Sequence, residues 1–328
     1  MTKAKTLRLC GIILSASLFA GGGGASVNSA QPLRQRLADA GAGVMVVAHR
    51  GCHAAAPRHG LPSAPENSLQ ALDHCIAMGV DMMETDVRRT RDGHLVMMHD
   101  AKVDRTTDGS GNVSDMTLAE IKGLHLRADL GGATAALTDQ RVPTLTEMLR
   151  YGGGRILFNL DIQEAIYGEV IDEAVRGGFA QDVLLKTRVG PASQALASIP
   201  PYDRVPFMPI LTKVTGTPDE IVAQARRQLS ARRRPVSFGT PQLGCPALTA
   251  LAHLARKGGV RLWTNSLQEG YYRDGPGGGD AQALVDPDRV WGRLIRAGFS
   301  MIQTDQPEAL KDFAARYPNG RATRIECR

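Results

Sequence analysis

Short apolar runs alternate along most of this chain with segments whose apolar residues recur at helical spacing. Strands are expected near 44–49, 82–88, 156–162, 182–187, 206–211, 235–239, 260–265 and 301–304. Helices are expected at 67–78, 144–151, 166–177, 218–231, 246–258, 288–297 and 306–316. Strands that alternate with helices form parallel sheets, because each helix returns the chain to the start of the next strand. Eight such strands predict a closed α/β barrel, in which functional groups gather at the carboxyl ends of the strands.

Composition agrees with one enzyme-sized globular body. The chain has 328 residues, of which 43% are hydrophobic and 22% charged, and these values exclude a disordered chain, a collagen and a coiled coil. The formal net charge of +6 falls to +3 when Lys3, Lys5 and Arg8 are left out. So small an excess of positive charge argues against nucleic acid as the partner.

The first 25 residues are typical of an export signal. A basic start precedes a twelve-residue, mostly apolar run from Leu9 to Ala20, and small residues follow it. The run is shorter than the roughly 20 residues that span a bilayer, so no stable membrane anchor is expected. We therefore expect a periplasmic or secreted protein. The expected organisation is a signal at 1–25, a linker or lead-in helix at 26–43, the barrel at 44–317 and a tail at 318–328.

Four cysteines remain after the expected signal: Cys52, Cys75, Cys245 and Cys327. An oxidising compartment permits disulfides between them. Their spacings are wide and include no zinc-type pair, so the sequence leaves open both the connectivity and the alternative of buried free thiols.

Unusual polar residues fall where the first two strands end. The first strand leads into His49 and Arg50. In the second strand Glu84 and Asp86 are two residues apart, which puts both carboxylates on one face. Two ionised carboxylates side by side repel each other, and a divalent cation is their natural partner. Oxygen ligands favour Mg²⁺ or Ca²⁺.

The same arrangement recurs further along the chain. Asp161 in the third strand supplies another carboxylate, and His99 follows the apolar run 95–98. A divalent metal together with Arg50 would neutralise a phosphate, while the two histidines could serve as general base or nucleophile and as general acid. This set of groups predicts phosphodiester cleavage.

The chain resembles the glycerophosphodiester phosphodiesterase family. The motifs that carry the resemblance are His49-Arg50-Gly51, Ala64-Pro65-Glu66-Asn67-Ser68, Glu84-Thr85-Asp86-Val87, Asp92-Gly93, His99-Asp100, Val103-Asp104-Arg105-Thr106-Thr107 and Thr304-Asp305-Gln306-Pro307. The resemblance implies a TIM barrel with an insertion after the second strand, here at about 93–142. It also implies hydrolysis of a glycerophosphodiester to sn-glycerol 3-phosphate and an alcohol.

The resemblance further assigns roles to individual residues. It implies a catalytic histidine pair at His49 and His99, and phosphate contact by Arg50. It implies a metal site whose ligands are Glu84, Asp86 and Asp161. Glu66 is expected close to the site as a substrate-binding residue, and Asn67 or Ser68 suits the start of a helix.

Two departures from the family pattern change the expected site. Gln163 stands where the family usually has a lysine, which removes a positive charge from the phosphate cavity. We expect Lys186, at the end of the fourth strand, to replace that charge, with simple exposure to solvent as the alternative. The first loop is lengthened by His53 and by Arg58-His59, which are expected at its rim.

Trp263 ends the seventh strand and is expected to wall the alcohol side of the substrate, with packing in the core as the alternative. A small-molecule phosphodiester is thus the expected partner. Two other functions stay open: a lyase resembling sphingomyelinase D, which releases a cyclic phosphate, and a phosphodiester-binding protein without activity. The sequence does not indicate an oligomeric state.

Overall fold

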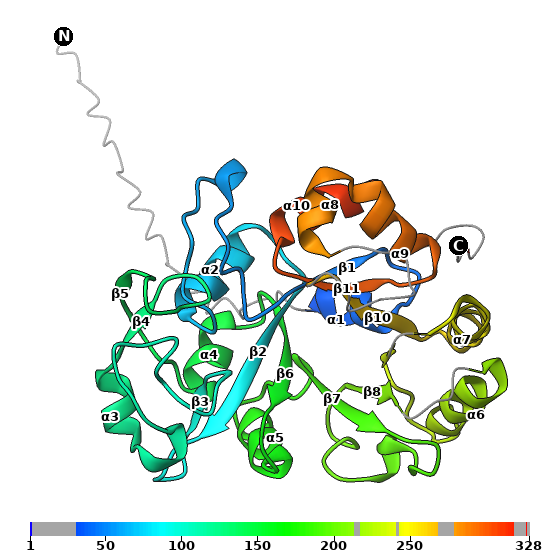
Figure 1. Cartoon of the computed structure of the whole chain (residues 1–328), viewed down its shortest axis with the longest axis horizontal. Helices are drawn as coiled ribbons and strands as arrows, with labels where there is room; N and C mark the ends of the chain where they lie inside the picture. Colours follow the sequence, from blue (N-terminus) through cyan, green and yellow to red (C-terminus); the bar gives the residue numbers. More distant parts are fainter. Residues whose placement is uncertain (2–30, 213–216, 241–242, 268–278, 318–325, 327–328) are drawn as a thin grey trace.

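Eight parallel strands close into a barrel in the computed structural model, which describes residues 1, 31–212, 217–240, 243–267, 279–317 and 326 (Figure 1). The barrel strands are β1 (Met45–Ala48), β2 (Met82–Arg89), β6 (Leu157–Ile162), β7 (Val183–Val189), β8 (Phe207–Leu211), β9 (Ser237–Gly239), β10 (Arg261–Asn265) and β11 (Met301–Thr304). Strand β1 pairs in parallel with both β11 and β2, and this pairing closes the sheet. The predicted TIM barrel is confirmed.

Helices follow most of the strands and cover the outside of the barrel. They are α2 (Leu69–Ala77), α4 (Leu145–Gly152), α5 (Tyr167–Arg176), α6 (Pro218–Leu229), α7 (Cys245–Gly258), α8 (Asp280–Val285), α9 (Arg293–Arg296), which continues the π-helix at Asp288–Gly292, and α10 (Pro307–Ala314). Helix α4 begins at a reciprocal cap in which Thr144 accepts from the backbone of Glu147 and the Glu147 carboxylate accepts from the backbone of Thr144. Among the described residues, no helix has the length and apolarity needed to cross a membrane.

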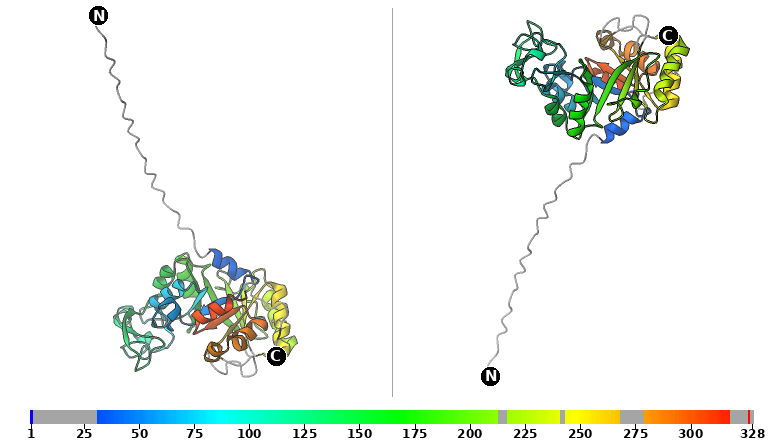
Figure 2. Two further views of the ribbon diagram at one scale, coloured as in Figure 1. Left: turned by 90° about the horizontal axis from the view of Figure 1, so that it is seen from above. Right: turned by 90° about the horizontal axis from the view of Figure 1, so that it is seen from below.

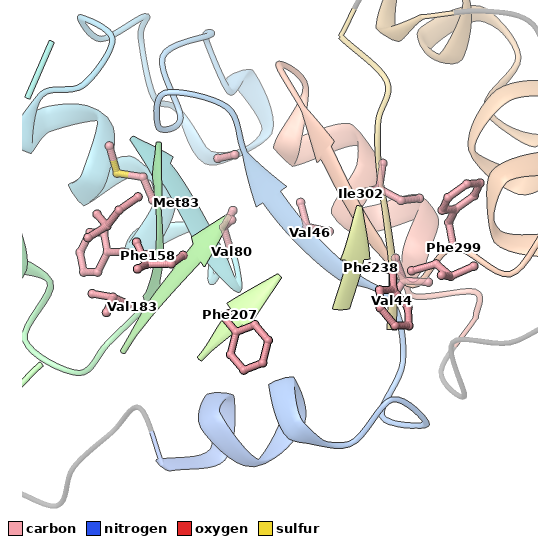
Figure 3. Packing of buried hydrophobic residues seen from close by; sticks show 14 of the residues in the cluster. Val44, Val46, Val80, Met83, Phe158, Val183, Phe207, Phe238, Phe299 and Ile302 are labelled. Atoms are coloured by element: carbon pink, nitrogen blue, oxygen red, sulfur yellow. The ribbon is translucent and has the colours of Figure 1, made fainter. Parts of the chain in front are cut away.

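The core has two layers because successive side chains of a strand point to opposite faces. The inner layer fills the barrel with one or two residues from each of seven strands: Met45, Val47, Met82, Leu157, Leu184, Met208, Trp263 and Met301. The outer layer lies between the strands and the helices. In Figure 3, Met83, Phe158 and Val183 lie together on one side of the barrel, and Phe238, Phe299 and Ile302 on another.

Helix α1 (Gln31–Ala38) closes the amino-terminal end of the barrel (Figure 2). Its Leu37 packs into the inner layer. Arg261 is 1% exposed and donates to the carbonyls of Arg36, Leu37, Asp39 and Gly43. Helix α1 therefore covers the amino-terminal end of the barrel strands and is held there by Leu37 and Arg261.

The insertion after β2 forms a small unit of its own at one side of the barrel, away from α6 and α7 (Figure 1). It contains β3 (Leu95–Met97), which pairs antiparallel with β2, the 3-10 turn Val113–Asp115, α3 (Leu118–Gly123), β4 (His125–Arg127) and β5 (Leu137–Arg141). A separate apolar cluster holds it together: Val96, Met98, Val103, Val113, Ile121, Leu126 and Val142.

A disulfide joins Cys52, in the loop after β1, to Cys75 in α2, with 5.2 Å between the Cα atoms. Cys245 is also disulfide-bonded. These bonds answer part of the connectivity that the spacings left open. The expected export signal, Cys327 and nearly all of the expected tail lie outside the described residues.

Candidate active site

A cavity of about 450 Å³ opens at the carboxyl ends of the barrel strands. Seven of the nine residues singled out from the sequence line it: His49, Glu84, Asp86, His99, Asp161, Lys186 and Trp263. The other two, Arg50 and Glu66, lie beside it and connect to it through hydrogen bonds. The structure therefore brings side chains from β2, β6, β7, β10, the end of β1 and the insertion to one place.

Three carboxylates form the floor of this cavity. Glu84 and Asp86 alternate along β2, and the parallel register of β2 and β6 puts Asp161 beside Asp86. One oxygen from each of the three lies within 4.8 Å of the others. Burial, followed by repulsion from Glu84, raises the pKa of Asp86 to about 7. Three converging hard oxygen donors and this excess of negative charge fit a divalent cation.

Lys186 on β7 reaches over this floor instead of pointing into solvent. Its Nζ lies 2.9 Å from Asp161 Oδ2 and 3.3 Å from Glu84 Oε1. Burial acts to lower its pKa, but the attraction of Glu84 and Asp161 prevails and raises the pKa above its usual range. Gln163 donates its amide to Asp86 Oδ1 at 2.9 Å. The positive charge expected to replace a lysine at the position of Gln163 therefore lies on β7, one strand away.

Each of the two histidines is paired with its own carboxylate. Asp305 follows β11, and its Oδ1 lies 2.7 Å from Nδ1 of His49. Nδ1 of His99 lies 2.7 Å from Asp100 Oδ1. A carboxylate only accepts, so in both pairs Nδ1 carries the proton and Nε2 is left for other partners. Such a pair fixes both the tautomer and the ring orientation, which is the arrangement that general acid–base catalysis needs.

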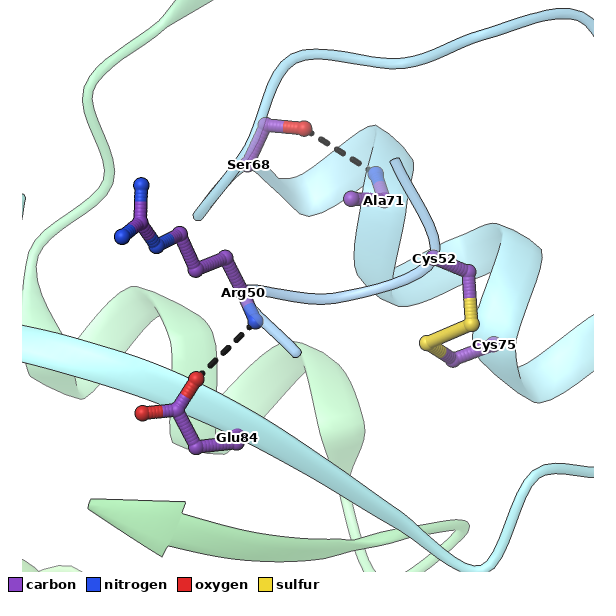
Figure 4. The surroundings of a disulfide bond; sticks show 6 residues. All are labelled: Arg50, Cys52, Ser68, Ala71, Cys75 and Glu84. Carbon is purple, nitrogen blue, oxygen red and sulfur yellow. Dashed lines mark hydrogen bonds between the residues drawn. A yellow bond between two sulfur atoms is a disulfide. The ribbon is translucent and has the colours of Figure 1, made fainter. Parts of the chain in front are cut away.

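Arg50 lies beside the floor in a strained left-handed conformation, with φ of 52°. Its backbone NH donates to Glu84 Oε2 at 3.0 Å (Figure 4). Its Nη1 lies 3.1 Å from Glu66 Oε2, and its Nε lies 3.9 Å from Asp86 Oδ2. That Nε is buried and has no hydrogen-bond partner in the described part of the chain, so a donor next to the cavity is left unused.

Glu66 lies beside the cavity and is not among its lining residues, and its contact with substrate stays a prediction. Its carboxylate is almost fully buried and accepts from Arg105 at 2.7 and 2.8 Å as well as from Arg50. Arg105 in turn donates to Asp100, the partner of His99. Glu66 thus connects Arg50 with the His99–Asp100 pair of the insertion. This connection is invisible in the sequence because it joins three distant segments.

The loop after Glu66 supports the carboxylate floor. Asn67 donates to Asp86 Oδ2 at 3.0 Å and accepts from the Asp86 backbone NH at 3.1 Å. Of the two residues expected to start the helix, it is Ser68 that caps α2, by accepting from Ala71 (Figure 4). Asn67 is left to hold Asp86 in place.

His53 is buried, so the prediction that it lies at the rim is wrong. It is 3% exposed and sits between Asp129 of the insertion and Asp305, with ring nitrogens 2.5 and 3.1 Å from their carboxylates. Arg58 and His59 do stay on the surface, where both pair with Glu308. The sequence of the loop does not indicate that His53 is buried while Arg58 and His59 are exposed, because the partner Asp129 lies 76 residues further along the chain.

The outer wall of the cavity combines aromatic, apolar and charged side chains, whereas its floor is made of carboxylates. Trp263 is 5% exposed and donates from Nε1 to Asn265 Oδ1 at 2.7 Å. Tyr167 and Ile210 add apolar surface. Arg188, two residues after Lys186 on β7, also lines the cavity and has no partner among the residues that the structure describes.

Comparisons with known proteins agree with this geometry. The sequence model described as "Glycerophosphoryl diester phosphodiesterase family" matches residues 49–187, and a model for a domain of unknown function matches 207–314. A glycerophosphodiester phosphodiesterase of Caldanaerobacter subterraneus subsp. tengcongensis is 29% identical over 278 residues, which cover 81% of this chain and 96% of that protein. A probable glycerophosphodiester phosphodiesterase 1 of Mycobacterium tuberculosis is 49% identical over 83 residues, 25% of this chain and 27% of that protein.

Solved structures show the same fold. A glycerophosphoryl diester phosphodiesterase from Parabacteroides distasonis has a TM-score of 0.64 at 20% identity and covers 88% of this chain and 93% of its own. An Oleispira antarctica phosphodiesterase in complex with the product sn-glycerol-3-phosphate has a TM-score of 0.54 at 18% identity. The match covers 82% of this chain and 96% of that protein.

Proposed function

Because the glycerophosphoryl diester phosphodiesterase model matches residues 49–187 and a glycerophosphodiester phosphodiesterase is 29% identical over 81% of the chain, we propose that this chain is a member of that family. We propose that its cavity hydrolyses glycerophosphodiesters to sn-glycerol 3-phosphate and an alcohol, with a divalent metal ion on the carboxylate floor. One observation carries the proposal: two histidine–carboxylate pairs meet three converging carboxylates at a single cavity. The intact pairs and floor argue against a protein that only binds phosphodiesters.

The metal ligands in this proposal are Glu84, Asp86 and Asp161. When Mg²⁺ or Ca²⁺ is bound there, it supplies positive charge that polarises the phosphoryl oxygens. Arg50 and Lys186 add fixed positive charge on two sides of the floor, so the negative charge of the phosphate is balanced before the reaction begins.

His49 and His99 move the protons. One of them takes a proton from the attacking water as the new O–P bond forms. The other gives its proton to the alcohol oxygen as the P–O bond to the headgroup breaks. Asp305 and Asp100 hold the two imidazoles in the required tautomers and stabilise each ring while it is protonated.

The test is product analysis by phosphorus NMR on the mature chain. Glycerophosphocholine, glycerophosphoethanolamine, glycerophosphoinositol and lysophospholipids are incubated with Mg²⁺ or Ca²⁺ and with a chelator. Metal-dependent appearance of glycerol 3-phosphate is the expected result, and His49→Ala and His99→Ala should each abolish it. A cyclic phosphate product would make the protein a lyase, and absence of turnover with every substrate would overturn the proposal.

We further propose that the chain is exported to the periplasm or the medium. The support is the basic and apolar start of the sequence together with the Cys52–Cys75 disulfide, a bond that persists in oxidising compartments. Expression of the full chain in a bacterial host, followed by fractionation and amino-terminal sequencing, should give a periplasmic product that begins near residue 26. A cytoplasmic product that keeps residue 1 would contradict export.

A further inference from the structure

A chain of three hydrogen bonds runs from the insertion to the histidine at the end of β1. Asp129 lies 2.5 Å from Nδ1 of His53, Nε2 of His53 lies 3.1 Å from Asp305 Oδ1, and the same oxygen lies 2.7 Å from Nδ1 of His49. His53 is buried and does not line the cavity, so it does not touch substrate.

The hydrogen-bond inventory determines the charge of His53. Both of its ring nitrogens face carboxylate oxygens, which only accept. Both nitrogens must therefore donate, and the ring that satisfies this requirement is the imidazolium. Although burial acts against the charged form, the bonds to Asp129 and Asp305 prevail and raise the pKa of His53 to about 9.

We propose that His53 is a positioning residue that acts through Asp305. Its positive charge holds the Asp305 carboxylate in place and partly neutralises it, so Asp305 stabilises the protonated form of His49 less strongly. A histidine bound to an uncompensated buried carboxylate retains its proton more firmly, and both a general acid and a general base must release a proton in each turnover. This inference rests on the proposed role of His49.

The other charged groups around this chain of bonds are few. Asp280, at the start of α8, accepts from the backbone NH of Asp305 at 2.7 Å and from the hydroxyls of Ser266 and Thr304. It adds negative charge near Asp305. Among the described groups facing Asp305, His53 and His49 are thus the ones that can compensate its negative charge. Removing His53 should therefore change how strongly Asp305 interacts with His49.

The direct test is NMR of the metal-free chain labelled with ¹⁵N-histidine. His53 should show two protonated ring nitrogens up to about pH 9. In His53→Gln, the midpoint of the His49 titration should move to higher pH by about one unit, a tenfold tighter hold on the proton. His49 is assigned with His49→Gln, and His59→Gln is the matched control because His59 also pairs with a carboxylate, but on the surface and with Glu308. A neutral His53 at pH 7.5, or an unmoved His49 midpoint, would overturn the proposal.

Kinetics provide the second measurement. In His53→Gln the limb of the pH profile that His49 controls should shift in the same direction, kcat should fall, and KM should change less than about twofold because His53 lies outside the cavity. Asp129→Asn removes the negative charge of one of the two carboxylates that face His53 and should give a smaller shift of the same sign. A loss of kcat with an unshifted profile would show a merely structural role.

The NMR arm needs no turnover, so it separates two kinds of failure. If the chain does not hydrolyse glycerophosphodiesters, the proposed function fails while the charge of His53 and its effect on His49 can still be measured. If the enzyme is active but the His49 midpoint does not move, the inference fails by itself.

Discussion

Lys186 on β7 holds its ammonium group 2.9 Å from the carboxylate of Asp161 on β6. In relatives with a lysine at the position of Gln163, that positive charge would come from the strand that carries Asp161. Here the neighbouring strand supplies it, and Gln163 is a hydrogen-bond donor to Asp86.

Lys186→Met should lower kcat/KM by about tenfold to a hundredfold, because a charged contact to phosphate contributes about 1.5–3 kcal/mol. Steady-state kinetics with glycerophosphocholine measure the loss. The double variant Lys186→Met with Gln163→Lys returns a cation to the site and should recover part of the rate. Unchanged turnover in the single variant would exclude Lys186 from the phosphate site.

Asp161→Asn should weaken binding of Mg²⁺ or Ca²⁺ by about tenfold or more, since it removes one of three converging carboxylates. Isothermal titration calorimetry of the metal-free chain measures the affinity. Asp172→Asn is the control, because Asp172 lies on α5, in the same part of the chain, and pairs with Arg204 at the surface. Equal affinities in the two variants would place the metal elsewhere.

Arg188→Ala should act on substrate preference more than on the reaction itself. The Arg188 side chain lines the outer cavity without a partner in the described residues, so it favours a headgroup with negative charge. We expect kcat/KM to fall about tenfold for a substrate whose leaving alcohol carries a second phosphodiester, as in deacylated cardiolipin, and little for glycerophosphocholine. Equal losses with both substrates would refute this selectivity.

Acidification should weaken the fold through Asp305. Burial acts to raise its pKa, but the bonds from His49 and His53 prevail and hold the pKa well below its usual range. The ionised carboxylate therefore stabilises the fold above about pH 4, the ordinary pKa of an aspartate, and this contribution is lost as the pH falls toward the lower folded-state pKa. Urea unfolding between pH 2.5 and 6 should show a shallower decline for Asp305→Asn than for the unchanged chain. Parallel curves would contradict this assignment.

The sequence predicted the barrel well because its signals are local. Each strand is a short apolar run, each helix has its own period, and alternation along β2 puts Glu84 and Asp86 on one face without any knowledge of distant segments. Six of the seven site residues that line the cavity meet there for the same reason, because strand ends of a barrel converge wherever the strands are identified correctly. The seventh, His99, comes from the insertion.

The features that the sequence did not reveal all concern contacts between distant segments. His53 is buried because the insertion brings Asp129 to it, and the buried carboxylate of Glu66 pairs with Arg105 of the insertion. The pairing of Cys52 with Cys75 depends on how the first loop returns to α2. Neither periodicity nor spacing reports on such contacts.

The insertion after β2 has its own small apolar core, separate from the two layers of the barrel. It also carries His99, Asp100, Arg105 and Asp129, so the residues of the reaction centre rest on separate apolar cores of unequal size. Partial unfolding of the smaller unit would leave a closed, folded barrel that still holds its carboxylates and yet has lost one of its two proton carriers. Activity would then decline before any global loss of structure is detected.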